Sequence, residues 1–199
     1  ASSSGLFDAV IVSTDDDEIA SIALTAGAEV PFRRPPRLAD DFTGTVEVIS
    51  HATEWLTSAG WSLRYVCCIY PCSPLLLAAD LAQGKEMLES ANWDYVFSCY
   101  QDPGLLRAFT TDASGGVSIL FPKHTASRTQ DLPFAYRDAG QFYWGRVEAW
   151  SRQVPLHGPT SSVVIMPSNR ACDIDTEEDW ARAEFLAMNL GVARPVECK

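Results

Sequence analysis

The sequence predicts a three-layer α/β fold built on a mainly parallel central sheet. Short apolar runs alternate with segments of helical periodicity through the first half of the chain. The apolar runs, rich in β-branched and aromatic residues, are DAVIVST (8–14), YVCCIYP (65–71) and YVFSCY (95–100). Helical spacing marks residues 15–28, 45–60 and 78–91. Such alternation is typical of parallel strands whose crossover helices cover both faces of a sheet.

The elements of the first half follow from local spacing. Residues 15–28 repeat apolar side chains at Ile19, Ile22 and Ala23 and stop near Gly27. An extended AEVPF segment (28–32) follows. The next helix, 45–60, gathers its apolar residues on one side: Val46, Ile49, Ala52, Thr53 and Leu56. We expect each helix to return the chain to the sheet for the next strand.

The second half loses this alternation after residue 101. A DASGGV segment (112–117) predicts a hairpin turn, which also accounts for Gly115 and Gly116 without a phosphate loop. Later extended segments are SILFP (118–122), QFYWG (141–145) and SVVIMP (162–167), and a final helix is expected over about 177–190. With 199 residues, 47% of them hydrophobic, and no linker or repeat, the chain is expected to form one domain, 1–199.

Charge and composition exclude several classes of partner. The formal charge is −11, which leaves no basic face for a nucleic acid and favours a small nucleotide accompanied by a divalent cation. No apolar stretch reaches the roughly 18 residues of a membrane span. Six cysteines without a C-x-x-C pair, and an opening segment unlike a signal sequence, favour the reducing cytoplasm.

Ligands of open α/β sheets bind beyond the carboxyl ends of strands, so the residues after each apolar run are the candidates for a site. Asp15 to Glu18 fit the first turn of a helix, where the macrodipole favours acidic residues. Arg33, Arg34 and Arg37 instead suggest an anion to hold, since the protein is acidic. His51, His124 and His157 have no spacing suited to a zinc site.

The segment CDIDTEEDW (172–180) combines two signals. If it is extended, Asp173 and Asp175 project to one face while Ile174 points into the core. Two carboxylates plus ligand oxygens and waters suit Mg²⁺. Thr176 and Asp179 have the spacing of a capping box, so the second half of the segment is expected to be structural.

Four segments in this order resemble the cytidylyltransferases that activate nine-carbon acidic sugars. They are SGLFDAVIVSTDDDEIA (4–20), GAEVPFRRPPRLADDFTGT (27–45), SRTQDLPFAYRDAGQFYWGR (127–146) and DIDTEEDW (173–180). The DAGQFYWG segment is similar to the pseudaminic acid branch rather than the sialic acid branch. The resemblance implies a Rossmann-like, GT-A-like nucleotidyltransferase fold. It also implies transfer of CMP from CTP to the anomeric hydroxyl of a nonulosonic acid, with loss of pyrophosphate, for surface glycan or flagellin glycosylation.

The same resemblance assigns residues to roles. It makes Asp173 and Asp175 the ligands of Mg²⁺ (or Mn²⁺) and, with Arg34, the catalytic residues. It places the nucleotide against Arg34, Thr43, Thr45 and Ser73, and the threonines could equally cap the next helix. It places the sugar against Tyr70, Cys72, Arg128, Gln141, Phe142 and Tyr143, with ordinary core packing as the alternative for Phe142 and for Trp144. Family members are homodimers, and residues 101–140 match their dimerisation segment.

Two departures from the family pattern bear on these expectations. Family members begin with a strand and a glycine-rich basic loop that wraps the triphosphate, and this sequence starts beyond that part of the pattern. We therefore expect either a piece of a longer enzyme or a variant without turnover. In YPCSPLL, Tyr70, Cys72 and Leu76 differ from the sialic acid branch, which leaves the sugar open.

Three other functions compete with this interpretation. Asp-Ile-Asp is literally the D-x-D metal motif of nucleotide-sugar glycosyltransferases, but there it normally follows a middle strand rather than preceding the last helix. A cytidylyltransferase for Kdo or sialic acid would differ mainly in the sugar pocket. A binding module that kept the sugar pocket and lost catalysis is the third. No G-x-S-x-G segment supports a hydrolase.

Overall fold

The computed structural model describes residues 1–190 of the chain, and these form two compact units. The first unit contains residues 1–68, 77–97 and 142–162. The second contains residues 69–76, 98–141 and the chain from Val163 onward. No helix among the described residues has the length and apolar character needed to cross a bilayer. The segment 101–140, singled out in the sequence, lies within the second unit.

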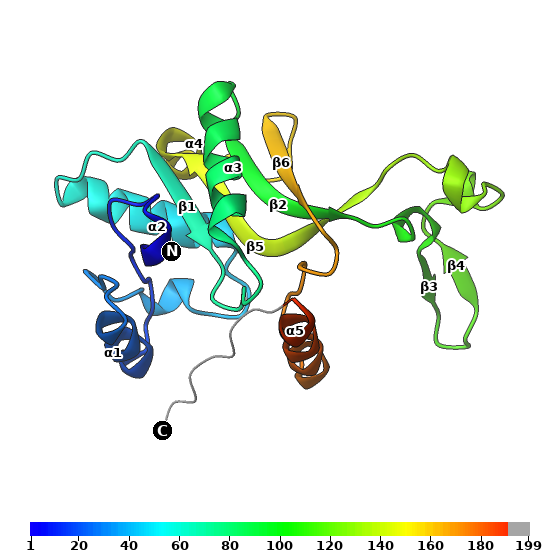
Figure 1. The fold of residues 1–199 in the computed structure, drawn as a ribbon, viewed down its shortest axis with the longest axis horizontal. Coiled ribbons are helices and arrows are strands. Elements are labelled where there is room, and N and C mark those ends of the chain that lie inside the picture. The colour runs from blue at the N-terminus through cyan, green and yellow to red at the C-terminus, as the bar shows by residue number, and fades with distance from the viewer. Residues whose placement is uncertain (191–199) are drawn as a thin grey trace. The chain divides into compact units, whose positions relative to one another are not determined.

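From α2 onward, helices and strands of the first half of the chain alternate as predicted (Figure 1). The helices are α1 (Asp17–Thr25), α2 (Thr45–Ser58), α3 (Ala78–Ser90), α4 (Val147–Ser151) and α5 (Glu177–Asn189). The strands are β1 (Tyr65–Ile69), β2 (Tyr95–Gln101), β3 (Phe109–Thr111), β4 (Val117–Ile119), β5 (Tyr136–Arg146) and β6 (Ser161–Met166). Short 3-10 turns cover Ser2–Ser4, Pro36–Leu38, Leu105–Arg107, Pro122–His124 and Thr129–Asp131.

A four-stranded sheet has the order β1-β5-β2-β6. Just after β5, Val147 N–H donates to Arg64 O, and in the middle of β5 the Gln141 oxygen accepts Tyr70 N–H. β5 therefore runs antiparallel to β1. It also runs antiparallel to β2, because Arg146 N–H bonds to Asp94 O and Asp102 N–H bonds to Ala135 O. β1 and β2 are parallel to each other, so the predicted α/β class is confirmed with β5 as an antiparallel insertion.

Within the first unit, α3 packs on one face of β5. Trp144 Nε1–H donates to Leu81 O over 2.9 Å, and its ring stacks on Phe7. Gly84 sits where a Cβ would come within 2.8 Å of the rings of Phe142 and Trp144. Only glycine lets helix and strand approach this closely. Trp144 is 2% exposed, so the core-packing alternative for this residue is confirmed.

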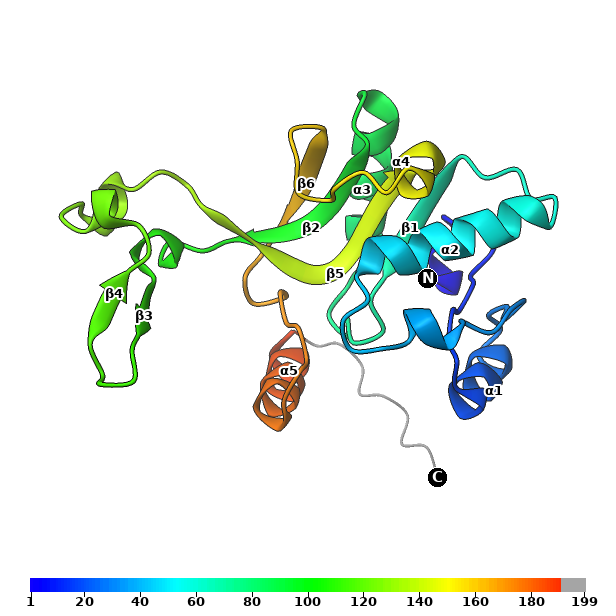
Figure 2. The ribbon, with the colours of Figure 1, turned by 180° about the vertical axis from the view of Figure 1, so that it is seen from behind.

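The other face of the same strand receives α4, which lies beside α2 (Figure 2). A Cβ on Gly145 would meet the indole of Trp150 at 2.4 Å and the Tyr95 ring at 2.6 Å. Trp150 is fully buried, and its Nε1–H donates to Val66 O. Helices therefore pack on both faces of β5 in this unit, as a three-layer fold requires.

Several elements differ from the sequence-based expectation. Residues 8–14 form a single parallel bridge, Ile11 with Glu29, rather than a strand. The first helix starts at Asp17 because Asp16 is its N-cap and accepts Ile19 N–H at 2.8 Å. QFYWG lies inside the longer β5, and α4 has too few residues to show helical periodicity.

The second unit carries an apolar hairpin. β3 and β4 pair antiparallel with Phe109 opposite Ile119, which confirms the hairpin predicted from DASGGV. Asp112 closes its turn by accepting Ser114 N–H and Gly116 N–H. Phe109, Val117 and Phe134 are 57%, 62% and 75% exposed. Both views show β3 and β4 as an arm standing apart from α5 of the same unit (Figures 1 and 2).

Candidate functional site

The N-terminus of α5 fixes the position of the Asp-Ile-Asp segment. Thr176 Oγ1 accepts Asp179 N–H at 3.2 Å, and the Asp179 carboxylate accepts Thr176 N–H at 3.0 Å. Asp175 N–H donates to the same carboxylate. The predicted capping box is therefore confirmed, and it holds the backbone of Asp175 as well as that of Thr176.

Between the two aspartates, Ile174 packs against a buried cluster of Leu75, Cys172 and Ala183. Asp173 and Asp175 are both exposed. The alternation expected from the sequence is confirmed: one side chain anchors the segment and two carboxylates face outward. Anchoring at a single apolar residue places both carboxylates with little freedom of the backbone between them.

Electrostatics at this segment favour a cation. The pKa of Asp173 is raised above its ordinary value, first by burial, then by the charges of Asp175 and Asp138. A cation would relieve this repulsion. Within residues 1–190 there is no group of three His, Cys, Asp or Glu side chains placed to bind a metal. Two carboxylates with oxygens from a ligand and water are nevertheless a usual set for Mg²⁺, so the residues fit the predicted metal.

Asp138 is a residue that the sequence analysis missed. It lies on β5, accepts Gly140 N–H at 2.9 Å, and adds its charge to that of Asp173. Gly140 has φ +61°, and a Cβ there would meet an Asp173 carboxylate oxygen at 2.9 Å. The signal available in the sequence was the Asp-x-Gly spacing, which permits this local turn within a strand.

The loop after β1 reaches the same strand. Tyr70 N–H donates to Gln141 O at 3.0 Å, and Ser73 Oγ–H donates to the same oxygen at 3.4 Å. Cys72 is exposed and Tyr70 is half-buried. The second unit therefore joins the loop carrying Tyr70, Cys72 and Ser73 to the part of β5 that faces Asp173.

Three residues assigned to the sugar lie in the interior. Gln141, Phe142 and Tyr143 are 0%, 0% and 4% exposed. Gln141 Nε2–H donates to Arg170 O, and Phe142 packs toward Gly84 of α3. Direct sugar contact by these side chains stays a prediction, and their burial favours packing and positioning instead. Side chains of a central strand are covered by the helices on either face of the sheet. A sequence motif does not show whether a side chain is covered in this way.

Arg128 lies in the arm-bearing part of the second unit. Its guanidinium donates to both carboxylate oxygens of Asp131, at 2.6 and 3.1 Å, and its side chain is 72% exposed. Such a bidentate pair holds the guanidinium of Arg128 in one orientation. The predicted contact with the sugar carboxylate would have to compete with Asp131.

Of the predicted nucleotide residues, Arg34 lies beside the start of α1. Arg34 N–H donates to Thr14 O, and its guanidinium contacts Asp15 at 3.3 Å. Arg33 pairs with Asp17 at 3.0 Å. Two buried polar atoms, Arg34 Nε and Ser13 Oγ, have no hydrogen-bond partner within residues 1–190. Buried donors of this kind suit a ligand with acceptor oxygens.

Thr43 belongs to a loop organised by Asp40. The Asp40 carboxylate accepts the Thr43 hydroxyl at 2.8 Å and the backbone N–H groups of Phe42 and Thr43. Gly44 is the N-cap of α2 and that helix has no side-chain cap, so the capping alternative for Thr43 and Thr45 is wrong. The nucleotide contact of these threonines stays a prediction.

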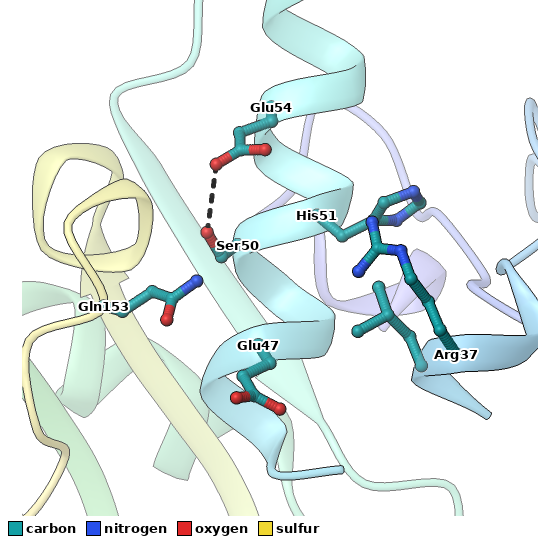
Figure 3. Close-up of a pocket in the computed structure, with 7 residues that line it drawn as sticks. Arg37, Glu47, Ser50, His51, Glu54 and Gln153 are labelled. Atoms are coloured by element: carbon teal, nitrogen blue, oxygen red, sulfur yellow. Dashed lines mark hydrogen bonds between the residues drawn. The ribbon is translucent and has the colours of Figure 1, made fainter. Parts of the chain in front are cut away.

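A polar cavity of about 320 Å³ also opens in the first unit; it is lined by Arg37, one of the three arginines suggested to hold an anion, and by none of the residues that the family resemblance assigns. Figure 3 shows Ser50 bonded to Glu54 with Gln153 pointing toward them, while Arg37 lies beside His51. Gln153 has φ +52°, the left-handed conformation that ends α4. No motif in the sequence marked these residues as a group.

The α/β fold, the paired carboxylates before α5 and the arginines near α1 agree with the nucleotidyltransferase expected from the sequence. The family model described as "Cytidylyltransferase" matches residues 1–167, and the chain belongs to this family. It is 38% identical over 187 residues to pseudaminic acid cytidylyltransferase from Campylobacter jejuni, covering 94% of this chain and 81% of that protein.

The chain is also similar to more distant relatives. N-acylneuraminate cytidylyltransferase A from Danio rerio is 27% identical over 94% of this chain and 43% of its own length. Among solved structures, a CMP-2-keto-3-deoxy-manno-octonic acid synthetase complexed with CTP matches with a TM-score of 0.54 at 10% identity, covering 94% of this chain and 70% of the other. This structural likeness confirms the nucleotidyltransferase fold.

Proposed function

We propose that this protein transfers CMP from CTP to the anomeric hydroxyl of a nonulosonic acid, releasing pyrophosphate. The observation that carries the proposal is the pair of exposed carboxylates, Asp173 and Asp175, held before α5 by the half-buried Ile174 and the capping box. Its similarity to pseudaminic acid cytidylyltransferase across 94% of the chain supports the same reaction class.

The residues act by positioning and electrostatics, because nucleotidyl transfer needs no covalent enzyme intermediate. Asp173 and Asp175 would hold Mg²⁺, or Mn²⁺, which supplies positive charge to the phosphate oxygens and the leaving pyrophosphate. Arg34 keeps its Nε buried and available as a donor while Asp15 orients its guanidinium. A donor fixed in advance stabilises developing phosphate charge without reorganising during the reaction.

The sugar we propose is pseudaminic acid. The chain is 38% identical to a pseudaminic acid enzyme and 27% identical to an N-acylneuraminate enzyme. The loop with Tyr70, Cys72 and Ser73 is tied to β5 and presents the exposed Cys72. Differences in this loop would separate the acids by the shape and hydrogen bonding of the pocket.

Two further properties belong to the proposal. The arm of β3 and β4 exposes Phe109 and Val117, and an apolar surface of this kind suits a second copy of the chain, giving a homodimer. The five described cysteines are all free, in keeping with work in the cytoplasm.

The test is pyrophosphate release by protein expressed from its complete reading frame, with CTP, Mg²⁺ and a panel of pseudaminic, sialic and Kdo acids. We expect release to need all three components and to be fastest with pseudaminic acid. Faster release with another acid would reassign the substrate. No release with any acid, alongside retained binding of CTP or sugar by calorimetry, would favour the binding module instead.

A further inference from the structure

Gln141 is a buried polar residue of the second unit with hydrogen bonds to several segments. Its side chain has no exposed surface, although glutamine seldom lies wholly inside a protein. Its backbone N–H donates to Ser98 Oγ on β2. Its backbone oxygen accepts Tyr70 N–H and Ser73 Oγ–H, and its side-chain amide donates to Arg170 O. One residue thus joins β2, the loop after β1 and the turn before Asp173.

The turn before Asp173 is held from a second direction. Arg170 N–H donates to Pro167 O, and Arg170 Nη1–H lies 3.5 Å from Leu75 O in the loop after β1. Cys172 then packs with Leu75 and Ala183. Residues 170–172 are therefore fixed between β5 and the loop at 70–76, and Asp173 follows them directly.

Gly140 completes this arrangement beside Gln141. A side chain at Gly140 would clash with the Asp173 carboxylate. β5 therefore contacts Asp173 itself at Gly140, and it contacts the turn before Asp173 through the next residue, Gln141. The two contacts fix both the side chain and the backbone of the same segment. The sequence motif alone led to the prediction that Gln141 contacts the sugar. In the structure, its side-chain amide instead donates to Arg170 O, in the turn before Asp173.

We infer that Gln141 is a positioning residue, one that couples the loop predicted to hold the sugar (70–73) to the segment predicted to hold the metal (170–175). This inference rests on the proposed function for the identity of the two ligands. The coupling means that changing Gln141 alters metal binding and sugar binding together, through the backbone segments that its hydrogen bonds hold. One acceptor atom, Gln141 Oε1, is buried without a partner within residues 1–190, which leaves room for a water or loop donor to join the network.

The test compares Gln141→Leu with Val164→Ala in the full chain. Gln141→Leu keeps the bulk and removes the amide, while Val164→Ala deletes buried volume from β6, where Val164 is 1% exposed, and leaves the Gln141 bonds in place. Mn²⁺ binding is measured by electron paramagnetic resonance without substrates, and amide hydrogen exchange is followed over 70–76 and 167–173.

For Gln141→Leu we expect Mn²⁺ affinity to fall about tenfold, in the range that supporting residues of metal sites show, and exchange to rise in both segments together. Steady-state assays should show a higher KM for the sugar together with a higher Mg²⁺ requirement. Val164→Ala should lower the melting temperature without these changes. Unchanged Mn²⁺ affinity in Gln141→Leu, or faster exchange in one segment only, overturns the coupling. Mn²⁺ binding and exchange do not need turnover, so they distinguish failure of this inference from failure of the proposed function.

Discussion

The backbone of Gly140 lies against the carboxylate of Asp173. A Cβ at Gly140 would come within 2.9 Å of Oδ2 and 3.1 Å of Cγ, and the residue has φ +61°. Asp173 can keep its position only while residue 140 has no side chain. At Gly140 the strand therefore fits against the Asp173 carboxylate because residue 140 is a glycine, and the next residue, Gln141, is hydrogen-bonded to Arg170 O.

Gly140→Ala should lower activity at least about tenfold, because the new methyl group displaces the Asp173 carboxylate. It should also destabilise the fold by about 1–2 kcal/mol, the usual strain of an L-residue in the left-handed region. Gly115→Ala is the matched control, since Gly115 has φ +85° with nothing within 4 Å of its added Cβ. Equal activity losses in the two variants would show that strain alone is responsible.

Asp175→Asn should reduce pyrophosphate release on the order of a hundredfold or more, because the amide is a poorer ligand for a divalent cation. The circular dichroism spectrum and melting temperature should stay near those of the parent protein, since Asp175 is exposed and the capping bonds use its backbone. Glu177→Gln removes a neighbouring exposed charge and should leave activity intact. Chelation with EDTA should abolish release and added Mg²⁺ should restore it. Normal activity in Asp175→Asn removes the metal role.

The carboxylate of Asp40 should titrate below its ordinary range. Its pKa is lowered first by the Thr43 hydroxyl, then by the N–H groups of Phe42 and Thr43. Because the pKa of Asp40 is lower in the folded state than in the unfolded state, its hydrogen bonds stabilise the protein at pH values above the unfolded-state pKa. This stabilisation is lost as the pH falls through the folded-state pKa. Thr43→Val should move the Asp40 pKa back toward 3.8, as followed by carboxyl NMR.

Asp112 provides the internal reference for that titration. Its pKa is also lowered, mainly by Ser114, and Thr43→Val does not touch its turn. The Asp112 titration should therefore stay unchanged in the variant. An Asp40 curve that does not move would show that the backbone N–H groups hold the loop without the hydroxyl.

The exposed arm gives a prediction about association. Changing Phe109 and Val117 together to serine should shift the protein toward monomer in sedimentation velocity, because the arm loses apolar area available to a second copy. Phe185→Ser on α5 is the control, since that side chain is 63% exposed in the same unit. A parent protein that sediments as a monomer at all concentrations would contradict the proposed homodimer.

The periodicity of the sequence was enough to predict the helices α2, α3 and α5 nearly to their ends, since each has an apolar side and clear boundaries. It was less informative for residues 8–14, where an apolar run predicted a strand but only Ile11 forms a bridge. Apolar runs report burial, whereas strand pairing depends on a neighbour that a local pattern does not contain. The antiparallel direction of β5 was not predicted, because it too depends on pairing with distant strands.

In the candidate site too, local features were predictable from the sequence and long-range contacts were not. Ile174 between two aspartates revealed which side chains face outward, because burial alternates locally. The roles of Asp138, Gly140 and Gln141 depend on contacts with residues about 30 positions away, which spacing alone cannot reveal. Arg34 with Asp15 was likewise visible only as two separate charged segments.

The bonds from Gln141 to Tyr70 and Arg170 end on main-chain atoms of those residues. Main-chain groups are the same in every amino acid except proline, so this framework places few demands on which side chains occupy the loop. Replacements at Tyr70 or Cys72 could then accumulate during evolution without dismantling the neighbouring carboxylate segment. Such tolerance would let related enzymes diverge toward different acidic sugars while retaining one arrangement for the chemistry.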